Sequence, residues 1–297
     1  MTTRAFRLPI RSLVALTAAV FATPVLLEAQ GRGRGASTPR SDSLRTAQRL
    51  DTEGKHAEAR AIFQALIDNA PDPAAKAQVQ RRMAMSYGYT NECDKVVEYE
   101  EMVIAYWVTR EQEEPQNAHY QQGEMANEAA RVCLEAGDID TAERMYRRGS
   151  ELGNREPEPR THPKSLWDYR LAHALARIEA RRGNREAALR HVAEARRILD
   201  SDPKMAEDQE RWYPYLVGYV ALFTNDLPTA ERELTRVTTE LMPRDPFMHC
   251  LLAMTYEKMG QQDKAMEIYR KAFEMATGSN PPNVFARSFA GKKIGQR

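Results

Sequence analysis

The sequence predicts an all-α protein built from repeated helix hairpins. Apolar positions recur at the spacing of amphipathic helices through most of the chain, and pairs of apolar stripes flank short turns. The clearest unit spans residues 246–272 and turns at Gly260. Its stripes consist of Leu252, Ala253 and Tyr256 before the turn and Ala265, Tyr269 and Ala272 after it. The composition, 42% apolar and 29% charged, suits soluble helices and argues against a membrane bundle or global disorder.

The same pattern recurs upstream of this unit. Its expected turns lie around Gly54, Gly137, Gly183 and Asp226. A weaker unit has Asn91 at its turn and Glu100 where an aromatic residue is expected. Six hairpins are therefore predicted, with starts near residues 40, 77, 123, 169, 211 and 246. The polar, proline-containing segments 110–122 and 154–165 are expected to form longer connections.

The combination of small and aromatic residues in each stripe resembles the tetratricopeptide repeat, a hairpin of about 34 residues. In the first unit these residues are Ala47, Ala59 and Phe63. The resemblance covers about residues 41–276 and implies a right-handed superhelical α-solenoid of about six hairpins. An irregular helical bundle is the structural alternative, because it would satisfy the same periodicity.

The N-terminal segment predicts export. Arg4, Arg7 and Arg11 precede an apolar run over residues 13–27, and Ala29 follows, as in a signal peptide of residues 1–29. The run is shorter than the ~20 residues of a spanning helix. We expect a periplasmic or cell-envelope protein, with an uncleaved membrane anchor as the alternative. Residues 30–40, rich in Gly and Arg, are expected to form a flexible linker; binding to an acidic surface or RNA is the less favoured interpretation.

The charge balance argues against nucleic acid as a partner. The whole sequence carries a formal net charge of +1, and removal of the predicted signal peptide leaves −1. A near-neutral chain has no global attraction for nucleic acid or an anionic membrane. Membrane contact is therefore expected only if the signal remains uncleaved.

Motifs of catalysis, cofactor binding or metal binding are not found in the sequence. The six His are scattered without a zinc spacing, and no nucleophile, Rossmann or Walker motif occurs. We therefore expect a protein that is not an enzyme and has no cofactor or metal. Of the three Cys, Cys93 and Cys133 are the pair whose helix ends should approach each other in stacked hairpins. Buried free thiols that fill small helix positions are the favoured alternative to a disulfide.

The family resemblance also implies a ligand-binding groove lined by the first helix of each hairpin. The projected positions form a basic end followed by an aromatic end. They are Arg81, Asn127, Arg131, Arg170, Arg177, Arg181, Trp212, Tyr215, Tyr219, Phe223, Phe247 and Met254. The groove hypothesis predicts that Tyr215 and Tyr219 are exposed in one patch. Arginine-rich solvated helices and buried core aromatics are the alternative interpretation of these residues.

The resulting functional hypothesis is a scaffold that binds a peptide or protein partner in this groove. One alternative is a small anionic or carbohydrate-like ligand in the same groove, for which a deep closed pocket would argue. Another is a membrane-tethered assembly factor or co-chaperone. The C-terminal extension, residues 277–297, is expected to hold a short capping helix in which Val284, Phe285 and Phe289 cover the last repeat. A docking peptide for another protein is the alternative.

Overall fold

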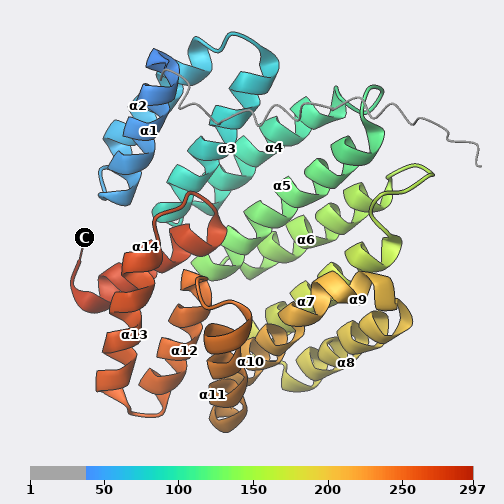
Figure 1. Cartoon of the computed structure of the whole chain (residues 1–297), viewed down its shortest axis with the longest axis vertical. Coiled ribbons are helices and arrows are strands. Elements are labelled where there is room, and N and C mark those ends of the chain that lie inside the picture. Colours follow the sequence, from blue (N-terminus) through green and yellow to red (C-terminus); the bar gives the residue numbers. More distant parts are fainter. Residues whose placement is uncertain (1–37, 297) are drawn as a thin grey trace, which may run out of the picture. The chain divides into compact units, whose positions relative to one another are not determined.

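The computed structural model describes residues 38–296, and the predicted signal peptide and most of the linker lie outside them. Within this range the chain forms an all-α solenoid of six helix hairpins without a strand, as the sequence predicts (Figure 1). The first three hairpins are α1 (Pro39–Thr52) with α2 (His56–Asp68), α3 (Pro73–Tyr89) with α4 (Cys93–Val108), and α5 (Pro115–Ala136) with α6 (Ile139–Asn154). The other three are α7 (Lys164–Arg181) with α8 (Arg185–Ser201), α10 (Tyr213–Phe223) with α11 (Leu227–Arg236), and α12 (Pro246–Lys258) with α13 (Gln262–Met275).

Each hairpin turns at a residue with a positive φ angle. Four of these residues are glycines, which adopt the left-handed conformation without a Cβ clash. The other two are Asn91, with φ of 58°, and Asn225, with φ of 64°. Asp226, expected at the fifth turn, instead caps α11, since its carboxylate accepts a hydrogen bond from Thr229 N. Asparagine and glycine therefore set the helix ends in all six hairpins.

Small residues allow the two helices of a hairpin to approach closely. Ala47 faces Ala59 in the first hairpin's core, and both are fully buried. Phe63 and, in the last hairpin, Tyr269 are also fully buried and fill the space between helices. Burial of such a large apolar side chain stabilises the fold by roughly 2–3 kcal/mol. The predicted stripes thus form the core.

The middle of the array departs from the predicted connections. Most of the expected connection at residues 110–122 is helical, because Pro115 takes the first position of a 22-residue α5. A short helix α9 (Pro203–Gln209) and the 3₁₀ helix η1 (Glu210–Trp212) instead precede α10. The π-helical turn η2 (Val237–Leu241) extends α11. At the N-terminal end α1 begins at Pro39, within the predicted linker, and Thr38 caps it.

A final helix, α14 (Pro281–Ile294), folds back across the array (Figure 1). It packs on α12 and α13 and also reaches α3 and α5. Arg82 donates a hydrogen bond to Ser279 O at 3.0 Å, and Tyr89 donates one to Gly278 O at 3.1 Å. Arg287 of α14 donates to Thr52 O at 3.0 Å. The C-terminal segment is therefore held at the first two hairpins as well as at the last.

A disulfide joins the second hairpin to the third. It links Cys93, at the start of α4, with Cys133, in the last turn of α5, and their Cα atoms are 5.0 Å apart. The favoured expectation of two free thiols does not hold for this pair, because the stacked helix ends bring the two side chains together. Cys250 is a buried free thiol. Among residues 38–296 no helix has the length and hydropathy to cross a membrane.

Candidate functional site

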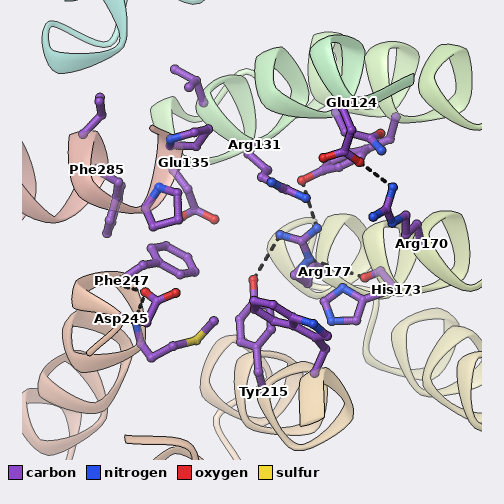
Figure 2. A pocket seen from close by; sticks show the side chains of 18 of the residues that line it. Glu124, Arg131, Glu135, Arg170, His173, Arg177, Tyr215, Asp245, Phe247 and Phe285 are labelled. Atoms are coloured by element: carbon purple, nitrogen blue, oxygen red, sulfur yellow. Dashed lines mark hydrogen bonds and ion pairs between the residues drawn. The ribbon is translucent and has the colours of Figure 1, made fainter. Parts of the chain in front are cut away.

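A cavity of about 380 Å³ lies on the side of the solenoid formed by the first helices of the hairpins. The helices α5, α7, α10 and α12 and the turn η1 supply most of its wall, α14 contributes another part, and single residues come from α3, the α3–α4 turn, α6 and α9. Its volume falls within the range of small-molecule sites, about 300–1,000 Å³. Figure 2 shows charged side chains from α5 and α7 opposite aromatic side chains from α10, α12 and α14.

Helical spacing directs the polar residues of α7 into this cavity. Tyr169, His173 and Arg177 are four residues apart, so their side chains leave the same face of the helix. Arg131 and Glu135 repeat this spacing on α5. Two consecutive first helices thereby present polar side chains to the same side of the cavity (Figure 2).

Arg177 is a buried cation without a carboxylate partner. Its side chain donates to Tyr146 Oη at 2.9 Å, to Tyr215 Oη at 3.1 Å and to the His173 carbonyl oxygen at 3.4 Å. The residue is 6% exposed and forms no ion pair with any of residues 38–296. Because arginine stays protonated in proteins, neutral phenols and a carbonyl surround a full positive charge. Burying a charge in this way is costly unless an anion compensates it.

Arg131 lies beside Arg177 and is also unpaired (Figure 2). Its guanidinium makes no hydrogen bond or ion pair within the described part of the chain. Arg170, a third arginine of the cavity, differs because it pairs with Glu124 and lies over the Trp167 ring, 4.9 Å from the centroid. Two of the cavity's arginines are thus available to an external anion.

Two further polar atoms of the cavity wall are buried without a hydrogen-bond partner in residues 38–296. They are Tyr169 Oη and His173 Nε2. Burial, with the positive charge of Arg177 as the second cause, holds the pKa of His173 well below its usual value. The imidazole is therefore neutral at physiological pH.

Three carboxylates lower the net positive charge of the cavity. Glu124 pairs with Arg170, and Glu135 accepts hydrogen bonds from Arg181 at 2.9 Å and from Tyr219 Oη at 2.9 Å. Asp245 caps α12, and its pKa is raised, chiefly by burial. With four arginines and three carboxylates in the lining, the cavity carries one formal positive charge in excess.

Aromatic side chains form the opposite wall. The Tyr215 and Phe247 rings meet edge to face with centroids 6.1 Å apart, and Phe247 meets Phe285 of α14 at 5.1 Å. Trp212 of η1 and Met248 of α12 extend this surface. One side of the cavity is therefore cationic and the other is apolar and aromatic.

Seven of the twelve predicted groove residues line this cavity: Asn127, Arg131, Arg170, Arg177, Trp212, Tyr215 and Phe247. The other five lie outside it: Arg81, Arg181, Tyr219, Phe223 and Met254. Arg81 binds Glu128, with 2.8 Å between Nε and Oε2. Arg181 lies over the Phe223 ring, 4.8 Å from its centroid.

The expected exposure of Tyr215 and Tyr219 is wrong. They are 5% and 0% exposed, respectively. The segment formed by α9 and η1 precedes α10, which packs against α7, so both rings enter the core and their hydroxyls bond to buried polar groups of α5 and α7. The site is thus a cavity with a buried wall and not an open aromatic groove at these residues.

Sequence reasoning missed part of the cavity. The missed polar residues are Asn91, Glu124, Glu135, Tyr146, Tyr169, His173, Gln209, Arg211 and Asp245. A signal was present for two of them, since Tyr169 and His173 precede the predicted Arg177 at steps of four on one helix. Phe285 was expected only as part of a capping helix; it does pack on Phe247 of the last hairpin, and this contact also places it in the cavity wall.

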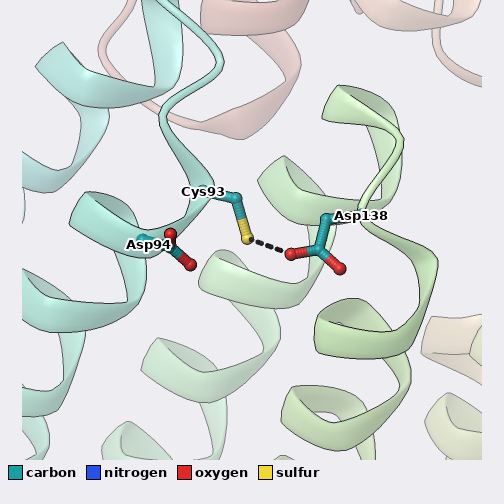
Figure 3. A group of neighbouring side chains, drawn as sticks. All are labelled: Cys93, Asp94 and Asp138. Atoms are coloured by element: carbon teal, nitrogen blue, oxygen red, sulfur yellow. Dashed lines mark hydrogen bonds between the residues drawn. The ribbon is translucent and has the colours of Figure 1, made fainter.

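A second cluster lies beside the disulfide. Cys93 Sγ is 3.5 Å from a carboxylate oxygen of Asp138, and the Asp94 carboxylate is close to both (Figure 3). The sulfur is bonded to Cys133, so it has no thiolate to offer a metal ion. Asp138 also caps α6 through Thr141 N, at 3.1 Å. The cluster therefore has a structural role at the junction of two hairpins.

Comparisons with known proteins agree with the repeat architecture. Two tetratricopeptide repeat models match the sequence, one over residues 43–73 and the other over residues 248–277. These segments lie in the first and last hairpins. The matches support a tetratricopeptide-repeat protein. Repeats of this kind suggest a protein–protein interaction scaffold and are typically non-catalytic.

Among solved structures, the chain is similar to the crystal structure of the yeast Tom70, with 13% identity and a TM-score of 0.29. The similarity covers 88% of this chain, which spans 65% of the length of that solved chain. No curated protein matches the sequence.

Proposed function

We propose that this protein is a non-enzymatic scaffold of the bacterial cell envelope that binds a peptide or protein partner on the side formed by the first helices. One observation carries the proposal: first helices of four successive hairpins converge on a single cavity with unpaired arginines and aromatic rings. Repeat arrays commonly use such a surface for recognition.

The mouth of the cavity gives the partner both polar and apolar anchors. Arg211 is exposed, and Arg131 and Trp212 are half-buried. Arginine guanidinium groups suit carboxylates, and partly buried aromatic rings suit apolar side chains. We infer that the partner presents an acidic residue next to an apolar one.

The envelope setting rests on the sequence of residues 1–29 and gains support from the disulfide. A disulfide such as Cys93–Cys133 persists in oxidising compartments and is rare in a reducing cytosol. Cell fractionation with mass measurement of the mature chain tests this part. A soluble exported chain that begins after Ala29 is expected; retention in the cytosol would contradict it.

Peptide display against the purified protein tests the partner proposal. The selected peptides should share an acidic residue beside an apolar one. Trp212→Ala should weaken the binding of these peptides at least tenfold, in the manner of an interface hot spot. Arg197→Ala is the matched control, because Arg197 is an exposed residue of the second helix α8 and pairs with Glu194. Equal peptide affinities of the two variants would show that the cavity mouth takes no part in partner binding.

A further inference from the structure

The cavity has the features of a small-molecule site in its own right. We propose that it binds a small organic acid, with one carboxylate held between Arg131 and Arg177 and an aromatic or branched apolar body against Trp212, Phe247 and Phe285. This inference goes beyond the scaffold function but shares Arg131 and Trp212 with the proposed partner site, so a bound acid and a partner anchored on these residues would compete.

The first step is charge. Arg177 is nine-tenths buried, and its hydrogen bonds go to two phenol oxygens and a carbonyl oxygen. Arg131 has no partner in residues 38–296. A carboxylate between the two guanidinium groups would compensate both charges through charge-assisted hydrogen bonds. The Tyr146 and Tyr215 hydroxyls hold Arg177 in place, so the site is preorganised.

The second step is the hydrogen-bonding capacity left over. Tyr169 and His173 line the cavity, and their atoms Tyr169 Oη and His173 Nε2 are buried and have no hydrogen-bond partner in the described chain. Native proteins seldom leave buried polar groups unsatisfied, since each costs roughly 1–3 kcal/mol. A ligand oxygen near α7 would satisfy these atoms if a side-chain rotation brought them to the cavity surface. They are unsatisfied polar groups on two residues of the cavity wall.

The third step selects a monoanion. Glu124, Glu135 and Asp245 also line the cavity, which leaves one excess positive charge over the whole lining when the exposed Arg211 at the mouth is included. A carboxylate neutralises that charge. A phosphate dianion would overcompensate it and meet the repulsion of the three carboxylates. The charge pattern therefore favours a carboxylic acid over a phosphate ester.

The fourth step selects a small molecule over an extended peptide. Pro281, Val284 and Phe285 of α14 form one side of the cavity, and Val284 is 1% exposed. The segment is anchored through Ser279 O to Arg82 and through Arg287 to Thr52 O. A chain threaded along the first helices would have to displace this packed helix. A compact molecule needs no such displacement.

Isothermal titration of the purified protein tests the proposal. The probes are phenylacetate, 3-phenylpropionate and 4-methylpentanoate, each beside its uncharged amide, together with inorganic phosphate and a hexapeptide that ends in phenylalanine. We expect at least one acid to bind about tenfold or more tightly than its amide, the difference that a charge-assisted hydrogen bond supplies. Phosphate should bind more weakly than that acid.

Arg131→Gln is the decisive variant, because the Arg131 guanidinium makes no hydrogen bond or ion pair within residues 38–296. It should lower the affinity for the acid about tenfold and leave that for the amide unchanged. Arg197→Gln on α8 is the matched control and should change neither affinity. Circular dichroism and the melting temperature verify that both variants fold.

Three results would overturn the proposal: equal binding of acid and amide, no binding of any acid at millimolar concentration, or tighter binding of the hexapeptide than of every free acid. Tighter binding of the hexapeptide would indicate that the cavity binds the C-terminal carboxylate of a peptide and not a small acid. Failure of the scaffold function can be distinguished from failure of this proposal. In that case peptide display would select no common sequence, while the acid would still bind.

Discussion

The terminal hairpins and the middle hairpins use the same architecture for different purposes. In the last hairpin, Ala253, Ala265 and Tyr269 are fully buried, and the Tyr269 hydroxyl donates to Glu257 at 2.8 Å. In the middle, α5 and α7 bury Arg177 and His173 and leave polar atoms without partners. The terminal units match the repeat pattern, while the middle units depart from it around the cavity.

This difference indicates where stability and where recognition reside. A hairpin whose small and aromatic residues interlock gains its stability from apolar burial. A hairpin that buries an unpaired cation sacrifices some stability, as binding sites often do. Variants that affect one region and spare the other therefore test whether stability and recognition reside in different hairpins.

The largest effect is expected at Gly153, where the helix α6 meets a buried ring. A Cβ added at Gly153 would lie 2.0 Å from Trp167 Cε2, and Trp167 is fully buried. Gly153→Ala should lower the free energy of unfolding by about 3 kcal/mol, measured by urea denaturation. Gly183→Ala is the control, because this turn glycine has open space around it and should lose about 1 kcal/mol from its positive φ alone. Equal losses would show that the middle hairpins do not depend on close helix approach.

The next effect concerns the disulfide between the second and third hairpins. The double variant Cys93→Ala/Cys133→Ala should lose about 2–4 kcal/mol, because the 40-residue separation no longer restricts the unfolded chain. Denaturation with and without dithiothreitol measures it. The reductant should destabilise the wild type and a Cys250→Ser variant but not the double variant. A reductant effect in the double variant would contradict this role.

A pH effect is expected at Glu100, which replaces the aromatic residue of a regular repeat. Both carboxyl oxygens are buried without a partner in the described residues, and burial, followed by the charge of Glu128, raises the pKa well above its ordinary 4.5. The folded protein therefore holds a proton that the unfolded chain releases. The contribution of Glu100 to stability is therefore greatest below pH 4.5 and is lost as the pH rises through its folded-state pKa.

Glu100→Gln removes this dependence. The variant should be more stable than the wild type at pH 8, and the gain should shrink toward pH 4. Thermal melts across this range measure it, with Glu98→Gln, an exposed neighbour on α4, as the control. A gain that is independent of pH would show that Glu100 does not titrate as described.

The smallest effect on stability is expected at Arg131. Because its guanidinium has no partner within residues 38–296, Arg131→Gln should change the free energy of unfolding by less than about 0.5 kcal/mol. Urea denaturation checks this value. A loss of several kcal/mol would mean that Arg131 holds the fold together and is not reserved for a ligand.

The sequence allowed most of the fold to be predicted, because local signals determine the hairpins. Residues such as Ala47, Gly54 and Phe63 combine helix periodicity, turn chemistry and close packing in one short segment. The extra helical segment before α10 was not predictable in this way. This segment is short and mostly polar, so its conformation depends on tertiary packing and not on a local pattern.

The candidate site was predictable in part. Arg131 and Arg177 follow from the repeat phase, since both lie on first helices at ligand-facing positions. The buried state of Tyr215 depends on how α10 packs against α7, and the place of Phe285 in the wall depends on how α14 folds back onto α12. Long-range packing of this kind leaves no local periodicity to detect.

A crystal structure of the protein with its tightest-binding organic acid tests the proposed acid site directly. The ligand carboxylate should lie within hydrogen-bond distance of both Arg131 and Arg177, its apolar body should contact Phe247 and Phe285, and α14 should remain in place. A ligand bound elsewhere, or a cavity that stays empty at saturating concentration, would contradict it.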